Sequence, residues 1–376
     1  MSLRQELSDY WSTIQGSLFP WLNEELGPLT EKHKQLITVL EMARVEAFVQ
    51  SWQGLPGRPP ADRSTLCRGF VAKAVLGLGT TTMLIERLKV DKTLRRLCGW
   101  ERRGQIPSES TFSRAFGEFA RSALPSRVHA ALIERTQKDR LIGHIARDST
   151  AIDARETPIR MKKAPKRRKR GRPKKGEEVI KPKRRLERQR GMTLADMLAD
   201  LPRHCAVGTK RNAKGHKTSW IGYKLHLDVA DGDLPISCLL TSASLHDSQA
   251  AIPLALITAG RITYLYDLMD SAYDAPEIKA TSHDLGHVPI IDPHPRNIEG
   301  GKAEKAAEIE RQRRVSHRAA EMIRYNERSA AERVNSRVKD DFGGRNIRVR
   351  GAPKVMCHLM FGILALTADQ LIRMII

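Results

Sequence analysis

The chain has 376 residues, enough for two or three domains with a substantial hydrophobic core. Its 65 Lys and Arg residues outnumber 43 Asp and Glu residues, and the resulting net charge of +22 predicts a polyanionic partner, with nucleic acid ahead of an anionic membrane surface. Five cysteines without a Cys-x-x-Cys pair exclude a disulfide-rich secreted scaffold and a zinc-finger reader, and a hydrophobic content of 40% excludes a wholly disordered chain.

The N-terminal third of the chain has the apolar spacing of helices. Apolar residues recur every three or four positions over 36–47 and again over 70–78. The Gly- and Pro-rich segment 54–60 interrupts this pattern. We therefore expect a helical N-terminal segment over 1–62 and a helical domain over 63–140.

One helix start in the second of these regions is well marked. Ser108 is the expected N-cap of a helix over 109–121. This helix would carry Phe112, Phe116 and Phe119 on one side. Short helices with a capped start suit a helix-turn-helix DNA reader, but an ordinary helical bundle would have the same pattern.

A strongly basic stretch follows. Residues 159–190 include 17 Lys and Arg against 3 Asp and Glu, a net charge of +14, with almost no apolar periodicity. Such a stretch cannot bury an apolar face, so we expect a flexible arm within a basic insert over 155–215. Its centre resembles the core of an AT-hook, formed by Arg170, Gly171, Arg172 and Pro173. An extended Arg-Gly-Arg fits a narrow A·T minor groove, and the alternative, a non-specific polybasic loop, also binds DNA.

Strand patterns begin after residue 140. We expect a first strand over 141–148 and a half-buried strand over 223–229, where apolar and polar residues alternate strictly. Asp231-Gly232 marks a turn to a hairpin partner over 235–241. The later elements are a helix over 246–259, a strand over 262–268, a helix over 275–284, a strand over 288–291 and a long helix over 303–339. This order predicts an α/β mixed domain over 141–376 with the element order of the ribonuclease H-like fold and the basic insert after the first strand.

The C-terminal segment 355–376 is the most apolar of the chain. It nevertheless contains Asp369 and Arg373, whereas a membrane span needs ~20 residues almost without charge. We therefore expect a buried core helix and no membrane partner. The N-terminus also lacks the basic and apolar regions of a signal peptide, which indicates a cytoplasmic protein.

Three carboxylates fall where this order of elements would gather them. Asp148 ends the first strand, Asp270 follows the strand over 262–268, and Glu332 lies on the long helix. Hard divalent cations prefer oxygen ligands, and two such ions can assist phosphoryl transfer. The sequence therefore predicts a metal site, with Asp267 and Asp153 as alternative ligands.

The long helix gathers further polar residues on one face. Tyr325, Arg328, Glu332 and Lys339 are spaced i, i+3, i+7 and i+14. At 100° per residue they lie within about 60° of arc. A carboxylate among cations suits a site that holds a DNA phosphate, whereas a generic basic helix with i,i+4 ion pairs is the alternative.

These four residues match the signature Tyr-x2-Arg-x3-Glu-x6-Lys, and the chain resembles the YREK group of DDE insertion-sequence transposases. The blocks that begin at Asp148 and Asp270 are similar to the two aspartate motifs of that group. Further similar blocks lie at 91–99, 106–111, 222–226 and 245–248. The resemblance covers most of residues 63–370, and it implies that the helical domain over 63–140 is a DNA-end-binding domain.

The resemblance implies a DNA transposase. Asp148, Asp270 and Glu332 would hold two Mg²⁺ ions, with Mn²⁺ as a substitute, for hydrolytic cleavage at the element ends. The freed 3′-hydroxyl would then attack target DNA. The DNA phosphates near the cleaved end would be held by Tyr325, Arg328 and Lys339. The partners implied are the double-stranded DNA of element ends and target, and a second copy of the chain, on the nucleoid of a bacterium.

Two departures from the group and two other functions stay open. Ala272 stands where the group often has Gly, and the chain has no Trp after Trp220, so we do not predict a hairpin intermediate. A domesticated, non-catalytic DNA-binding protein would keep the same fold and basic arm. A nuclease of this fold would need the same acidic residues but would not join DNA.

Overall fold

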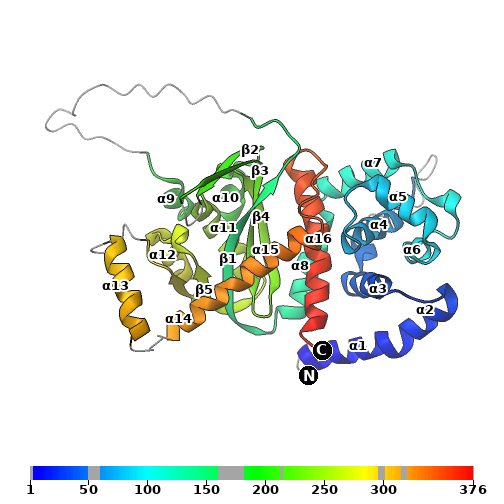
Figure 1. Cartoon of the computed structure of the whole chain (residues 1–376), viewed down its shortest axis with the longest axis horizontal. Coiled ribbons are helices and arrows are strands. Elements are labelled where there is room, and N and C mark those ends of the chain that lie inside the picture. The colour runs from blue at the N-terminus through cyan, green and yellow to red at the C-terminus, as the bar shows by residue number, and fades with distance from the viewer. Residues whose placement is uncertain are drawn as a thin grey trace.

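The structure is a computed structural model that describes residues 3–49, 60–159, 182–211, 215–294, 301–314 and 320–375. Helices make up the N-terminal part, as expected (Figure 1). They are α1 Leu3–Thr13, α2 Phe19–Leu26, α3 Glu31–Ala43, α4 Arg63–Val75, α5 Thr81–Val90, α6 Lys92–Leu97, α7 Glu109–Arg121 and α8 Leu124–Gln137, with the shorter turns η1 Ile14–Leu18, η2 Val45–Phe48 and η3 Arg103–Gln105.

The C-terminal part combines one sheet with helices. Its strands are β1 Leu141–Asp153, β2 Ala206–Arg211, β3 Lys217–Ala230, β4 Leu234–Ser242, β5 Thr263–Met269 and β6 Val288–Ile291. Its helices are α9 Arg185–Gln189, α10 Leu194–Asp200, α11 Ala251–Ala259, α12 Pro276–Asp284, α13 Gly301–Arg314, α14 Ala320–Tyr325, α15 Ser329–Asp340 and α16 Ala352–Arg373, with the 3₁₀ turns η4 Asp247–Ala250, η5 Ser271–Tyr273 and η7 Asn326–Arg328.

The sheet is mixed, and each strand predicted after residue 140 is present. Its strand order is β2-β3-β1-β5-β6, with β4 also paired to β3. Strand β1 runs antiparallel to β3 and parallel to β5, and β5 is parallel to β6. Because β1 and β5 are parallel neighbours, their C-terminal ends meet at the same edge of the sheet.

The prediction that the strand over 223–229 is half-buried was wrong. His226 and Asp228, on its polar face, are as buried as the apolar residues between them. Helix α11 packs on that face, and its Thr258 hydroxyl donates a hydrogen bond of 2.6 Å to Asp228. Alternation of polar and apolar residues signals solvent on one face only when no helix covers it.

A buried ionic cluster lies under that helix and joins three strands. The Arg147 guanidinium on β1 donates two hydrogen bonds to the Asp228 carboxylate on β3, at 2.7 and 2.8 Å. It also lies 3.2 Å from the carboxylate of Asp267 on β5. Burial alone would lower the pKa of Arg147, but the two carboxylates hold that pKa well above its usual value. The guanidinium is therefore a charged cross-link through the centre of the sheet.

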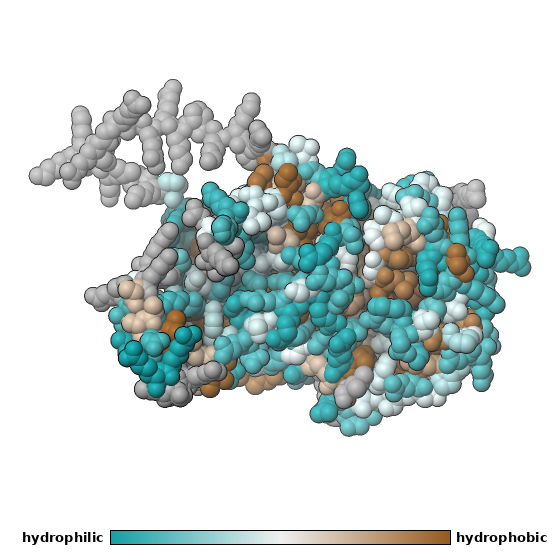
Figure 2. All heavy atoms as spheres, viewed as in Figure 1, coloured by the Kyte–Doolittle hydropathy of each residue, from teal (hydrophilic) through white to brown (hydrophobic). Residues whose placement is uncertain are grey.

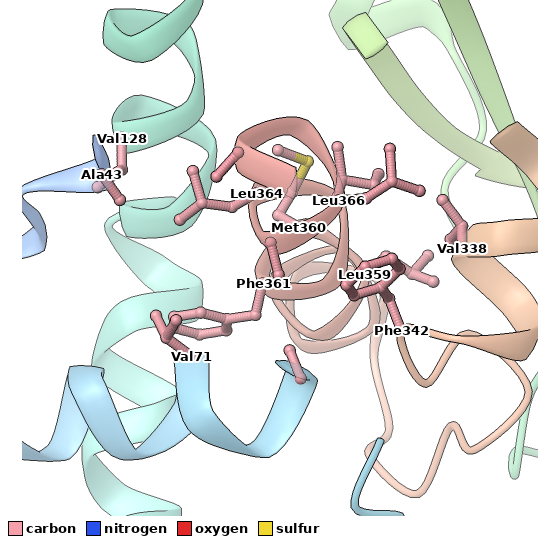
Figure 3. Close-up of a cluster of buried hydrophobic side chains, with 14 of the residues drawn as sticks. Ala43, Val71, Val128, Val338, Phe342, Leu359, Met360, Phe361, Leu364 and Leu366 are labelled. Carbon is pink, nitrogen blue, oxygen red and sulfur yellow. The ribbon is translucent and has the colours of Figure 1, made fainter. Parts of the chain in front are cut away.

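Helix α16 is the core helix that the C-terminal segment predicted. By length and composition it could cross a membrane, but 78% of its most apolar window is buried inside the protein. Figure 3 shows Phe361 and Leu364 directed toward the N-terminal helices and Leu359 toward Phe342, which follows α15. One hydrophobic core therefore continues from the helical part to the sheet.

The surface agrees with a chain of high net charge. In Figure 2 hydrophilic side chains cover most of the visible face, and apolar groups form small separate patches. One such patch lies near β2 and β3, where Val207 and Ile221 are about half exposed.

Two further expectations need correction. The long helix over 303–339 is interrupted, since α14 ends at Tyr325 and a 3₁₀ turn precedes α15. That turn packs against β1 and β5, and packing on the sheet outweighs the local preference for a continuous helix. The flexible arm was expected over the basic stretch 159–190, but the described part of that stretch includes helix α9, and the rest of the insert 155–215 contains α10 and β2. The AT-hook-like residues 170–173 lie outside the described ranges.

We expect Arg147→Met to lower the free energy of unfolding by about 3–5 kcal/mol, because the Asp228 and Asp267 carboxylates would stay buried without their partner. Urea denaturation measures this change. The matched control is Arg333→Met, which breaks the partly exposed ion pair with Asp233 and should cost less than about 1 kcal/mol. Equal losses in the two variants would show that the cluster is not the cross-link described above.

Candidate active site

Two of the three predicted carboxylates, Asp148 and Asp270, lie where the pairing of β1 with β5 ends. The expectation that Asp148 ends the first strand was wrong, because β1 continues to Asp153 through its pairing with β3. Ala146 on β1 pairs with Leu268 on β5, so Asp148 and Asp270 each stand two residues beyond that pair. Strand residues alternate between faces, and both carboxylates lie on the face opposite Arg147. Helix α15 covers that face, and its Asn335 donates a hydrogen bond of 3.1 Å to Asp148.

The electrostatics of the pair favour a cation. Burial raises the pKa of Asp148 to about 6, and the nearby negative charge of Asp270 adds to the shift. Burial also raises the pKa of Asp270, although the N–H of Ala272 donates a 2.9 Å hydrogen bond to its carboxylate. Arg328 and Lys210 lower both pKa values but do not offset burial. Two partly buried, incompletely neutralised carboxylates fit a divalent cation, which prefers oxygen ligands.

The third carboxylate stands apart from this pair. The Glu332 side chain is 58% exposed and accepts a 2.8 Å hydrogen bond from Arg328. Within the described ranges, no three His, Cys, Asp or Glu side chains lie close enough to hold one metal ion together. Arg328 links the two parts, because it pairs with Glu332 and lies within electrostatic range of Asp148.

The other members of the predicted helix face lie at the two ends of this region. Tyr325 packs against Arg328, with the guanidinium 5.7 Å from the ring centroid, and burial raises the pKa of its hydroxyl. Lys339 lies at the far end of α15, half-buried and within electrostatic range of Asp153 and Lys210. Tyr325 and Arg328 remain in contact although the helix is interrupted before α15.

The alternative ligands Asp267 and Asp153 occupy different environments from the pair. Asp267 is completely buried on the other face of the sheet, where burial raises its pKa but the charge of Arg147 and the hydrogen bonds of His287 and Ser282 together keep that pKa low. Asp153 is exposed at the end of β1. Neither shares the buried edge at which Asp148 and Asp270 meet.

Two residues of this site were not predicted from the sequence, Asn335 and Lys210. Asn335 follows Glu332 by three positions, so both lie on adjacent parts of one helical surface. An Asn among the buried residues Ala331, Val334 and Val338 was a usable signal, because Asn is a poor helix former that needs a partner when buried. Lys210 had no such signal, since it comes to the site only through the pairing of β2 with β3.

Asp148→Asn should stabilise the metal-free protein at pH 7. The pKa of Asp148 rises on folding from 3.8 to about 6. The folded chain therefore binds more protons than the unfolded chain between these values, and this carboxylate makes the free energy of unfolding fall as pH rises through that window. Removing the carboxylate should add about 3 kcal/mol at pH 7 and little near pH 4.

Urea denaturation in EDTA at the two pH values tests this expectation. The control is Asp153→Asn, whose exposed side chain should leave stability unchanged within about 0.5 kcal/mol at both values. If the Asp148 variant were less stable than the native protein at pH 7, ionised Asp148 would not lower the free energy of unfolding, contrary to the expectation.

Comparison with known protein families agrees with this geometry. The family model described as transposase DDE domain matches residues 140–368, and a second model, transposase domain (DUF772), matches residues 24–118. Searches of curated proteins and of solved structures gave no match. The first match covers the sheet, both aspartates and α15, and it spans more than half of the chain. The chain therefore belongs to the transposase DDE domain family.

Proposed function

We propose that this transposase cuts DNA at the ends of an insertion sequence and joins the freed 3′-hydroxyl to target DNA, with Asp148, Asp270 and Glu332 as its catalytic carboxylates. The observation that carries the proposal is the position of Asp148 and Asp270, each two residues beyond the last pair of the parallel strands β1 and β5 and on the face covered by the helix that bears Glu332. The spacing of the four residues of the YREK signature supports membership of the YREK group; these residues are Tyr325, Arg328, Glu332 and Lys339.

The sheet supports a ribonuclease H-like fold for the catalytic domain. Three antiparallel strands, β4, β3 and β1, continue into the parallel strands β5 and β6. In an open sheet with helices on its faces, sites form at the carboxyl ends of the parallel strands. The two aspartates occupy that position.

Asp148 and Asp270 would hold the metal ions, and Glu332 would complete the ligand set. Bound Mg²⁺ ions, or Mn²⁺ in their place, would activate water and neutralise charge on the leaving oxygen. Asn335 orients the Asp148 carboxylate by donating a hydrogen bond to one of its oxygens.

Arg328 would control the position of Glu332. A DNA phosphate can accept two hydrogen bonds from the Arg328 guanidinium. It would therefore compete with the Glu332 carboxylate for Arg328. Because the Glu332 side chain is exposed, release from Arg328 lets it turn toward the aspartate pair. Tyr325 and Lys339 would hold phosphates on either side, and DNA would thereby assemble its own catalytic site.

The remaining parts of the proposal concern DNA. The basic insert, including Arg170, Gly171, Arg172 and Pro173, would add phosphate and minor-groove contacts. A homodimer would bring two element ends together. The second candidate function is a non-catalytic DNA-binding protein. The ion pair of Glu332 with Arg328, which leaves Glu332 apart from the two aspartates, favours it.

We expect Glu332→Gln to reduce DNA cleavage about 100-fold or more while DNA binding persists, because a metal ligand would be lost. The assay combines purified protein with labelled DNA that carries the ends flanking its gene, in Mg²⁺, Mn²⁺ or EDTA. Glu327→Gln, an exposed carboxylate next to the same helix, is the matched control and should cleave normally.

Other outcomes separate the alternatives. Tight binding without cleavage in either metal would identify the non-catalytic binder. Cleavage without joining would identify a nuclease. Full activity of the Glu332 variant would remove this residue from the proposed catalytic set.

A further inference from the structure

A cavity of about 610 Å³ opens where the N-terminal helices meet the segment between α15 and α16. Aromatic side chains of α4, α7 and α16 form part of its wall. Among the described residues, its charged lining is formed by Lys73, Arg155, Arg348, Arg350 and Lys354, with a single carboxylate, Glu109. An excess of cations around one cavity is suited to an anion.

The cation deepest in this cavity is Lys73 of α4. Lys73 is only 9% exposed, and its ammonium group forms no ion pair with a carboxylate in the described part of the chain. Burial lowers the pKa of Lys73 to about 8. The neighbouring His358 contacts the carbonyl of Gly343 at 3.0 Å and supplies no negative charge. A buried cation without a partner costs stability, and a bound anion would offset that cost.

The start of α5 opens into the same cavity. Residues 79–82 line it, and the hydroxyl of Thr80 caps the helix by accepting from the N–H of Met83. The first N–H groups of a helix have no carbonyl partner within the helix, and they favour an anion together with the helix dipole. Glu109 accepts a 3.2 Å hydrogen bond from the Thr82 hydroxyl, so this carboxylate already has a partner.

We propose that the cavity binds a phosphodiester group of DNA, with Lys73 at its floor and Arg348 and Arg350 at its mouth. The inference rests on the proposed function, because DNA is the polyanion that the transposase handles. It adds a phosphate site on the helical part of the protein, separate from the carboxylates of the sheet.

The position of the cavity favours DNA over a free anion. Its wall includes Phe342, which follows Lys339 and the end of α15 by a few residues. Lys339 lies within electrostatic range of Arg345 and Lys210. Cations therefore continue from the aspartate pair along α15, which is about 18 Å long, to the mouth of the cavity. That length corresponds to about five phosphates along one DNA strand.

The test compares full-length Lys73→Met with the native protein in two measurements. Fluorescence anisotropy with duplex DNA of the element ends, over a series of salt concentrations, should show binding about 10-fold weaker and a salt slope smaller by about one. Thermal unfolding should show a variant at least as stable as the native protein, because methionine removes a buried, unpaired charge. Stability and DNA affinity should thus change in opposite directions, which a folding defect cannot produce.

The matched control is Lys138→Met, at the exposed end of α8, which should leave affinity, slope and stability unchanged. Unchanged DNA binding by the Lys73 variant, with native protein that binds and cleaves DNA, would overturn the cavity proposal alone. Native protein that binds no DNA would overturn the proposed function first. A third arm adds inorganic phosphate during thermal unfolding. Loss of phosphate stabilisation in the Lys73 variant without loss of DNA affinity would identify a free phosphate as the ligand and overturn the DNA assignment.

Discussion

The buried pairing of Arg147 with Asp228 and Asp267 is the interaction on which the candidate site depends. It joins β1, β3 and β5 on one face of the sheet. Because successive residues of a strand point to opposite faces, an inward Arg147 directs Asp148 outward toward α15. The same alternation carries Asp270 to that outer face, since its backbone is still extended after β5 ends. A slip of one residue would place either aspartate on the wrong face and leave a buried charge unpaired.

The outer face thus combines two partly buried carboxylates with few compensating groups. Asn335 donates one hydrogen bond to Asp148, while Arg328 and Lys210 supply positive charge from the side. The pKa of Asp148 remains near 6, so keeping this carboxylate ionised at neutral pH costs free energy of folding. Sites that bind metal ions commonly carry such a cost, and the stability of the sheet below them, here the Arg147 cluster, offsets it.

Helix α16 gives the two halves of the chain a common core. Phe361 packs against Phe70 of α4 and Phe116 of α7, while other residues of α16 pack against β4 and α15. Gly362 allows this close approach, because a Cβ at that position would lie 2.5 Å from the carbonyl oxygen of Phe342. DNA held by the helical part, including a phosphate at Lys73, would therefore keep a defined position relative to the carboxylates of the sheet.

The sequence by itself predicted the helical N-terminal part, five of the six described strands and the core helix at the C-terminus, because hydrophobic periodicity and turn residues act over short distances. It also singled out Asp148 and Asp270 from their places after apolar strand segments. Only the tertiary structure decided which of these residues meet. The burial of His226 and Asp228, the break before α15, the pairing of Glu332 with Arg328 and the approach of Asn335 and Lys210 all depend on elements distant in the chain. Helix packing and strand register set these contacts, and no local pattern of residues encodes them.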